Sequence, residues 1–328
     1  ILQFDNVGYL GYYYPVTKIE ALSDGNCSCE KDMENPFVFS GPLAPLDEEL
    51  TVHLRGPLNL RKFGYYVTDS YSFGSSSGSW ERKAYYDSEQ GTANNVTFLA
   101  NYGNKNACLG NATDYVTPDG LKLANDSQVL DNTTIPSGYE VTIASDIKCQ
   151  GEDDCGAYRT DGQAYHGFYG LNKMFLFEFW APSDMSEEHK KNKTDGYDMP
   201  AIWLLNAHIP RTSQYPMNPN CSSWNTGAGE FDIFEVMNYT ERNNFYSTIH
   251  DFQGTDDIGT GLQNFGYLER TPESVMTGGV IFAEDKTITV FLSNSTSIDS
   301  TINNSDLSNW VSALEKETED IRTLSSIS

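Results

Sequence analysis

Positive charge is scarce in this sequence. Its 328 residues include 21 Lys and Arg against 46 Asp and Glu, which gives a formal net charge of -25 at pH 7. A chain this acidic repels phosphate backbones and anionic membrane surfaces, so nucleic acid is excluded as an expected partner. Long hydrophobic runs are also absent, because no stretch reaches the 18 consecutive apolar residues typical of a membrane-spanning helix. We therefore expect neither a nucleic-acid-binding protein nor a membrane span.

The cysteines lack the spacing of a metal site. The C-x-C and C-x5-C pairs stand without partner histidine clusters, so we expect disulfides rather than zinc. Six cysteines allow 15 pairings, and only Cys149 with Cys155, closing a short loop around GEDD, is favoured locally. Nothing in the sequence suggests a redox or phosphate-binding cofactor or assigns metal ligands, and a structural calcium stays open. The six cysteines are Cys27, Cys29, Cys108, Cys149, Cys155 and Cys221.

Glycosylation sequons are unusually frequent. Ten N-x-[ST] sequons beside six cysteines indicate a secreted glycoprotein with N-linked glycans. The sequence begins at Ile1 without a signal peptide, so we expect a mature, processed chain. The sequons lie at Asn26, Asn95, Asn111, Asn125, Asn132, Asn192, Asn220, Asn238, Asn294 and Asn303.

The chain divides at a stretch of glycine and serine. Residues 1–71 are rich in Gly, Pro and Tyr, with short strand-like runs, and we expect them to form an N-terminal β-rich module. The segment 72-SFGSSSGS-79 has the composition of a linker, although a long loop within one domain would have the same composition. We expect residues 80–328 to form the larger domain.

Strand patterns run through most of the chain and are not interleaved with helices. This arrangement predicts an all-β fold, a jelly-roll sandwich of the concanavalin type. In 305–324, apolar residues recur at helical spacing behind a Ser/Asp cap, so we expect one amphipathic C-terminal helix packed outside the sandwich. The predicted strands cover 50–56, 63–69, 96–101, 139–146, 174–180, 201–205, 231–237, 245–251 and 286–293.

One of these strands carries three acids in an uneven pattern. In 227-GAGEFDIFEVMN-238, Glu230 and Asp232 share a face, whereas Glu235 would point the other way on a regular strand. A β-bulge between Asp232 and Glu235 would add one residue and bring Glu235 onto the face of the other two. Because buried acids are costly without a purpose, the spacing predicts this bulge. A strand whose acids face solvent or bind calcium is the alternative.

Three converging carboxylates suit a particular chemistry. Retaining glycoside hydrolysis needs two carboxyl groups about 5 to 5.5 Å apart, one acting as nucleophile and the other as general acid and then base. An aspartate between them could share a proton or a hydrogen bond with the nucleophile, so that one carboxyl is ionised while the other is protonated. The pattern therefore makes Glu230, Asp232 and Glu235 the candidate catalytic residues.

The surrounding sequence resembles glycoside hydrolase family 16, the jelly-roll enzymes that include laminarinases and lichenases. The stretch 224-WNTGAGEFDIFE-235 resembles the family's catalytic segment with its E-x-D-x-x-E signature. Upstream, 200-PAIWLLN-206 resembles the preceding strand, and downstream 246-YSTIHDF-252 resembles the following one. The resemblance covers residues 80–293, and its specific part is about fifty residues long.

The resemblance implies a role for each matching residue. Glu230 would be the nucleophile, Asp232 its partner and Glu235 the acid/base, with His250 assisting the nucleophile side. Trp203 and Trp224 would offer faces for stacking on sugar rings, although Trp203 lies in an apolar strand and could equally be a core residue. The six-position spacing is that of laminarinase-like members, so the expected substrate is β-1,3-glucan. The family usually has a Glu and an Arg on the strand that corresponds to 174-MFLFEFW-180. This segment has Glu178 and no Arg, so the resemblance does not supply that arginine as a substrate contact.

Three functions stay open at this point. The first is a secreted endo-β-1,3-glucanase, similar to fungal cell-wall enzymes that are often held by a glycolipid anchor. The second is a transglycosylase that passes the same covalent intermediate to another glucan, because sequence does not show how well the cleft excludes water. The third is a wall protein that binds glucan without catalysis. In each case the N-terminal tyrosines, Tyr12 to Tyr14, could contact glucan or belong to a core.

Overall fold

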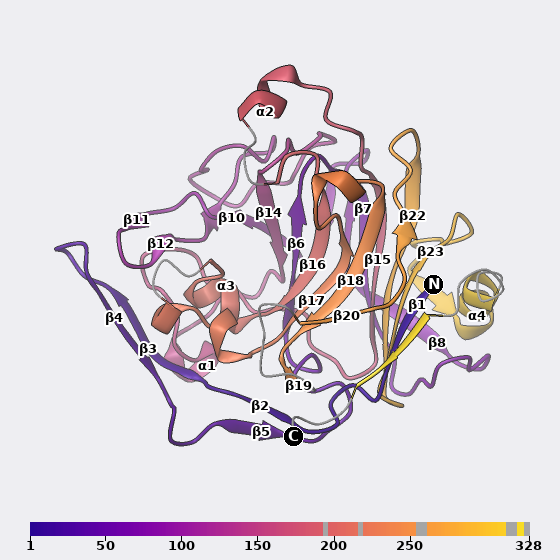
Figure 1. Ribbon diagram of the computed structural model, residues 1–328, viewed down its shortest axis with the longest axis horizontal. Helices are drawn as coiled ribbons and strands as arrows, with labels where there is room; N and C mark the ends of the chain where they lie inside the picture. The colour runs from indigo at the N-terminus through magenta and orange to yellow at the C-terminus, as the bar shows by residue number, and fades with distance from the viewer. Residues whose placement is uncertain (193–195, 216–218, 254–260, 313–319, 325–328) are drawn as a thin grey trace.

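Two large β-sheets pack face to face and enclose the main hydrophobic core (Figure 1). The computed structural model describes residues 1–192, 196–215, 219–253, 261–312 and 320–324. Each sheet has nine strands, and the core between them is rich in Phe, Leu, Ile and Val. The predicted all-β sandwich is therefore confirmed, and each of the nine predicted strands overlaps an observed one.

The first sheet is called the helix-covered sheet. Its strands follow the order β24-β8-β7-β15-β22-β23-β1-β25, with β9 paired to β8. In this order the bounds are β24 (Thr301–Asn303), β8 (Ser79–Asp87), β7 (Asn59–Val67), β15 (Lys173–Trp180), β22 (Val275–Ala283), β23 (Thr287–Leu292), β1 (Leu2–Asp5), β25 (Asp320–Thr323) and β9 (Thr92–Asn94).

The second sheet is called the cleft sheet. Its strands follow the order β13-β10-β14-β6-β16-β17-β18-β20, with β21 paired to β18. The bounds are β13 (Asp114–Tyr115), β10 (Thr97–Ala100), β14 (Glu140–Ala144), β6 (Leu50–Arg55), β16 (Ala201–Asn206), β17 (Glu230–Glu235), β18 (Asn244–His250), β20 (Leu262–Gln263) and β21 (Leu268–Glu269).

Alternating side chains explain why β15 is apolar almost throughout. Phe175, Phe177 and Phe179 point into the core between the sheets, whereas Met174 and Leu176 belong to a second cluster on the outer face. That second cluster includes side chains of helix α4 (Asn304–Ser312), which lies against the outside of this sheet (Figure 1). Because both faces of β15 are covered, the alternation of apolar and polar residues expected for a half-exposed strand is lost.

The C-terminal helix is shorter than predicted. Residues 304–312 are helical and pack on the sandwich as expected, but β25 is a strand that pairs in parallel with β1. Residues 313–319 of the predicted helix lie outside the described residues. The prediction of one helix over 305–324 is thus wrong at its end, because β25 instead covers the backbone hydrogen-bonding groups along the edge of β1.

The N-terminal segment does not form a module apart from the sandwich. Strand β6 lies between β14 and β16 of the cleft sheet, and β7 lies between β8 and β15 of the helix-covered sheet. The Gly/Ser segment 72–79 joins two neighbouring antiparallel strands, β7 and β8. It is held in place, since the side chains of Asn304 and Ser308 donate hydrogen bonds to the carbonyls of Ser77 and Ser75. The expected linker between two domains is a loop within one sheet.

Part of the N-terminal segment does extend from the sandwich as an arm. Strands β3 (Val16–Ala21) and β4 (Cys27–Lys31) form a hairpin, and β2 (Gly11–Tyr13) pairs with β5 (Phe37–Phe39) and β19 (Phe252–Gln253). Figure 1 shows this arm in indigo along the lower left of the molecule, reaching towards β11 (Lys105–Asn106) and β12 (Gly110–Asn111).

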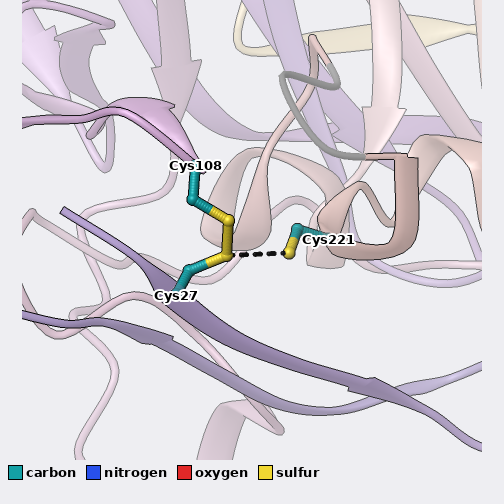
Figure 2. Close-up of side chains that lie close together, drawn as sticks. All are labelled: Cys27, Cys108 and Cys221. Atoms are coloured by element: carbon teal, nitrogen blue, oxygen red, sulfur yellow. Dashed lines mark hydrogen bonds between the residues drawn. A yellow bond between two sulfur atoms is a disulfide. The ribbon is translucent and has the colours of Figure 1, made fainter.

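Two disulfides join this arm to the rest of the chain. Cys27 bonds Cys108 and Cys29 bonds Cys221, and Figure 2 shows the sulfur of Cys221 beside that of Cys27, 3.5 Å away. The predicted Cys149–Cys155 disulfide is confirmed. The arm therefore tethers the loop around Cys221, which leads directly into the segment before β17.

Short helices and turns fill the connections between strands. No helix within the described ranges is long and apolar enough to cross a membrane. The short helices are α1 (Glu152–Cys155), α2 (Glu187–Asn192) and α3 (His208–Thr212), with 3-10 turns η1 (Pro219–Cys221), η2 (Trp224–Thr226) and η3 (Tyr239–Glu241).

Candidate active site

The acidic strand β17 contains the predicted bulge. Asp232 pairs with Thr248 and Glu235 with Tyr246, so three steps along β17 match two steps along β18. The same extra residue appears on the other side, where Trp203 of β16 pairs with Asp232 and Ile202 pairs with Phe234. The bulge therefore shifts the strand by one residue, and the alternation of side chains resumes on the opposite phase.

The shift places all three carboxylates on one face. Glu230, Asp232 and Glu235 line a single cavity of about 160 Å³, whereas Phe231 and Phe234 point into the core between the sheets. Strand β17 thus has an apolar face that stabilises the fold and an acidic face that opens to the cavity. The other lining residues are Arg55, Trp203, Gln214, Tyr215 and Trp224.

His250 lies where the sequence places it. It pairs with Glu230 across β17 and β18, and its Nε2 donates a hydrogen bond to Asp232 Oδ2 at 3.0 Å. Both side chains are almost fully buried, with 11% and 6% of their surfaces exposed. A charged or dipolar partner at this distance orients the Asp232 carboxylate, so His250 fixes the middle acid of the three.

Burial changes the protonation of the outer acids. Removal from water raises the pKa of Glu230 well above its usual range, and the nearby charge of Asp232 raises it further. The same two causes, burial first and Asp232 second, raise the pKa of Glu235 to about 7. Three acids in one cavity do not all ionise together at neutral pH, because like charges in a poorly solvated site repel each other.

Arg55 is a site residue that the sequence did not reveal. Its Nη2 lies 3.4 Å from Glu235 Oε1, and its Nε donates a hydrogen bond to the Met199 carbonyl at 2.7 Å. The strand between them contributes Ala201, which pairs with both Arg55 and Glu235 and is small enough for the guanidinium to reach across. The positive charge of Arg55 opposes the rise in the pKa of Glu235.

The two tryptophans differ in what they offer to the cavity. Trp203 is only 3% exposed, and its ring stacks on His53 at 5.4 Å between centroids with the Arg55 guanidinium 5.9 Å away. Little of its face is left for a sugar ring. Trp224 is half-buried in η2, 6.1 Å from the ring of His250. The buried indole Nε1 of Trp203 lacks a hydrogen-bond acceptor among the described residues, whereas a hydrogen bond from the Trp224 side chain to Glu230 opposes the rise in the pKa of that acid.

Sequence reasoning missed Arg55 because it assigned residues 1–71 to a separate module. The run 50-LTVHLRG-56 was predicted as a strand, and its alternation puts His53 and Arg55 on one face, but only the pairing of β6 with β16 brings that face to the acids. Gln214 and Tyr215 lie in a loop and follow no periodic pattern. Loop residues of this kind leave no sequence signal that would connect them to the cavity.

Metal ligands are not gathered near the acids in the part of the chain that the structure describes. There, His, Cys, Asp and Glu residues come close enough to share an ion only in two groups, Cys27 with Cys108 and Cys221, and Cys149 with Cys155 and His166. Every cysteine in these groups is in a disulfide, so none offers a thiolate. The candidate chemistry therefore rests on carboxylates, one histidine and one arginine.

Comparison with known proteins identifies the family. Residues 78–310 match the model described as cell wall protein YJL171C/Tos1, C-terminal, and residues 1–68 match its N-terminal counterpart. The chain belongs to the YJL171C/Tos1 family of cell wall proteins. The boundary between the two family models falls close to the Gly/Ser segment, although the sheets of the sandwich run across it.

Several relatives in the YJL171C/Tos1 family share most of their length with this chain. A Candida albicans protein named probable circularly permuted 1,3-beta-glucanase PGA52 is 51% identical over 315 residues, covering 94% of this chain and 81% of its own. Saccharomyces cerevisiae YJL171C, with the same descriptive name, is 45% identical over 97% of this chain and 81% of its own. Saccharomyces cerevisiae TOS1 is 38% identical over 94% and 89%. No solved structure matches this chain.

Proposed function

We propose that the protein is a cell-wall endo-β-1,3-glucanase that cleaves its substrate with retention of configuration. The observation that carries the proposal is the bulge in β17, because it brings Glu235 into the cavity that Glu230 and Asp232 already line. Carboxyl groups on one face of one strand, in a cavity open to solvent, suit attack on a sugar and protonation of its leaving group. The descriptive names of the relatives support the same substrate.

In the first step, Glu230 is the nucleophile and Glu235 the general acid. The Glu230 carboxylate forms a bond to the anomeric carbon while the bond from that carbon to the glycosidic oxygen breaks. Glu235 gives its proton to that oxygen, and the leaving chain departs as an alcohol. A pKa of about 7 keeps Glu235 largely protonated at mildly acidic pH, as a general acid requires.

In the second step, Glu235 acts as a base. It takes a proton from a water molecule whose oxygen bonds to the anomeric carbon, and the bond from that carbon to Glu230 breaks. The two inversions give net retention. Asp232, held by His250, lies between the outer acids in sequence and shares their cavity.

The strand order agrees with the circular permutation in the relatives' names. Strands β6 and β7 come from the first 71 residues, yet each lies inside a sheet between strands from later in the chain. A permuted chain would show this arrangement, because permutation moves the ends of the chain without changing the packing of its strands. It also explains how Arg55, far from Glu235 in sequence, reaches the same cavity.

A neutral glucan suits the charge of the site. Three carboxylates and one arginine line the cavity, in a chain with net charge -25, so an anionic polysaccharide would be repelled. Placement in the cell wall also agrees with the sequons, since the nine sequon asparagines with described side chains are all exposed and could carry glycans. Asn192 is the tenth, and its side chain lies outside the described residues.

The decisive test is Glu230→Gln assayed on laminarin. We expect sugar release to fall about a thousandfold or more, because the amide cannot form the covalent intermediate. The matched control is Glu178→Gln, which changes a half-buried carboxylate of β15 in the helix-covered sheet and should leave activity unchanged. Thermal unfolding of both variants checks that each is folded.

Two results would contradict the proposal. Unaltered sugar release by the folded Glu230→Gln variant would remove this residue from catalysis. Tight binding of insoluble β-1,3-glucan by the intact protein, with no release of sugar at any pH, would favour a wall protein that binds glucan without cleaving it.

A further inference from the structure

A second, larger cavity adjoins the one that holds the carboxylates. It has a volume of about 600 Å³ and is lined by Arg55 and Tyr215, which also line the catalytic cavity. A third cavity of about 310 Å³ meets the other two at Tyr215. Because Tyr215 lines all three, the space around the carboxylates continues along the cleft sheet rather than ending at the acids.

Tyr215 stands at the centre of this space. The residue is 52% exposed, and its hydroxyl donates a hydrogen bond to Glu140 Oε1 at 2.6 Å. Glu140 is on β14, directly opposite Arg55 of β6. The acid is thereby placed between a phenol and a guanidinium, and the ring of Tyr215 is held with much of its surface open.

The wall of the second cavity is kept clear by glycine. Gly196 has φ +89°, and a side chain there would meet Arg55 Cδ at 3.3 Å and the Gly138 Cα at 3.4 Å. Such a residue would be strained by its backbone and would crowd the arginine that joins the two cavities. The remaining wall includes Tyr139, which is 42% exposed, and Asn101.

These groups have the chemistry of a sugar-binding surface. Exposed tyrosine rings offer flat apolar faces to the C–H face of a sugar, and a carboxylate, a guanidinium and an amide offer fixed hydrogen-bond partners to its hydroxyls. The volume lies within the range of about 300 to 1,000 Å³ that is typical of small-molecule sites. Glu140 beside Arg55 leaves no excess positive charge, so the surface fits a neutral glycan.

We propose that this second cavity binds further glucose units of the same glucan chain, with Tyr215 and Glu140 as the residues that determine how long a chain is preferred. The proposal rests on the proposed function for the identity of the sugar. A chain of several units would then contact the catalytic and second cavities together, whereas a short one would occupy the catalytic cavity alone. Affinity should rise with chain length because of these residues.

The test separates binding from turnover. Glu230→Gln serves as the parent, and its affinities for laminaritriose and laminarihexaose are measured by calorimetry, alone and combined with Tyr215→Ala. We expect the second change to lower the affinity for laminarihexaose about tenfold, and to lower the affinity for laminaritriose clearly less, because the ring also lines part of the catalytic cavity. Glu140→Gln on the same parent keeps the size of the side chain and should lower the affinity for laminarihexaose about threefold.

The matched control is Tyr9→Ala, which removes a tyrosine of similar exposure, 48%, that lines none of the three cavities. It should change neither affinity. An equal loss of affinity for both oligosaccharides would overturn the proposal. So would an unchanged affinity for laminarihexaose in both the Tyr215 and the Glu140 variants, or failure of the parent to bind laminarihexaose.

Failure of the catalytic proposal can be distinguished from failure of the proposal for the second cavity. If the unaltered protein releases no sugar but the length-dependent loss is observed, the second cavity stands and the catalytic proposal fails. If sugar is released and Tyr215→Ala does not alter the preference for long chains, the catalytic proposal stands and the second cavity is overturned.

Discussion

The two sheets of the sandwich use their outer faces in opposite ways. On the helix-covered sheet, Trp80 and Leu176 pack against α4 through Leu307 and Trp310, and the face is sealed by apolar contacts. On the cleft sheet, the corresponding face carries Arg55 and the three acids of β17. Both sheets share the same core, so the comparison indicates that one outer face can be specialised for stability and the other for chemistry.

The difference has a physical origin. Sealing one face with a helix buries large side chains that would otherwise be exposed, at about 25 cal/mol per Å² of apolar surface. Burying acids on the other face raises their pKa values and is unfavourable to stability when they are ionised. Changes on the helix-covered sheet should therefore affect folding, and changes on the cleft sheet should affect turnover.

After Glu230→Gln, the largest effect expected on the cleft sheet is that of Glu235→Gln. With Glu235 as the proposed general acid, its loss should reduce kcat on laminarin by about a hundredfold to ten-thousandfold, because proton transfer to the leaving oxygen is lost. The free energy of unfolding should stay the same or rise, since a buried acid is removed. Steady-state kinetics and denaturant unfolding measure both. A large loss of stability with normal turnover would contradict the assignment of the cleft sheet's outer face to chemistry.

The opposite pattern is expected for Trp310→Ala on α4. Trp310 is 7% exposed and packs in the cluster outside the helix-covered sheet, so its truncation should lower the free energy of unfolding by about 3 to 5 kcal/mol. Turnover per folded molecule should be unchanged. Urea unfolding measures the loss of stability, and activity at low temperature measures turnover. Ser308→Ala on the same helix is the control, and it should lower the free energy of unfolding much less than Trp310→Ala.

A smaller effect, on pH dependence, is expected for Arg55→Gln. Its charge opposes the raised pKa of Glu235, so its loss should raise that pKa further and move the alkaline limb of the kcat profile upward by up to about one pH unit. Arg55→Lys keeps the charge and should leave the limb near its original position. A profile that moves downward, or equally in both variants, would remove Arg55 from control of the acid.

The smallest effect concerns Asp251, which follows His250 in the chain. It is fully buried, burial raises its pKa to about 7, and Oδ2 has no hydrogen-bond partner within the described part of the chain. The folded state then binds more protons than the unfolded state between about pH 4 and 7, so stability should fall as the pH rises through that window.

Asp251→Asn, which stays neutral, should flatten this decline. Unfolding at pH 5 and pH 8 measures it, with the exposed Asp146→Asn as control. A decline of the same size in Asp251→Asn and in the unaltered protein would contradict the assignment.

Sequence predicted the parts of the fold and of the site that depend on local pattern. The sandwich, its strands and the bulge follow from side-chain periodicity, and the bulge follows from the odd position of Glu235. The separate N-terminal module and the long helix were wrong because strand pairing is not local. The pairing of β6 with β16 joins residues about 150 positions apart. Arg55 was missed for the same reason, and Tyr215 was missed because a loop residue follows no periodic pattern.

The pairing of β1 with β25 has a mechanical consequence. The two strands run in parallel at the edge of the helix-covered sheet, Leu2 beside Asp320 and Asp5 beside Thr323. A tension that pulled β1 from its first residue and β25 from its last would act along the strands in opposite directions. Their hydrogen bonds would be loaded in shear, all at once, rather than opened one after another. A cell-wall protein with this parallel pair of strands would resist a force along the strands better than a force that peels one strand from the other.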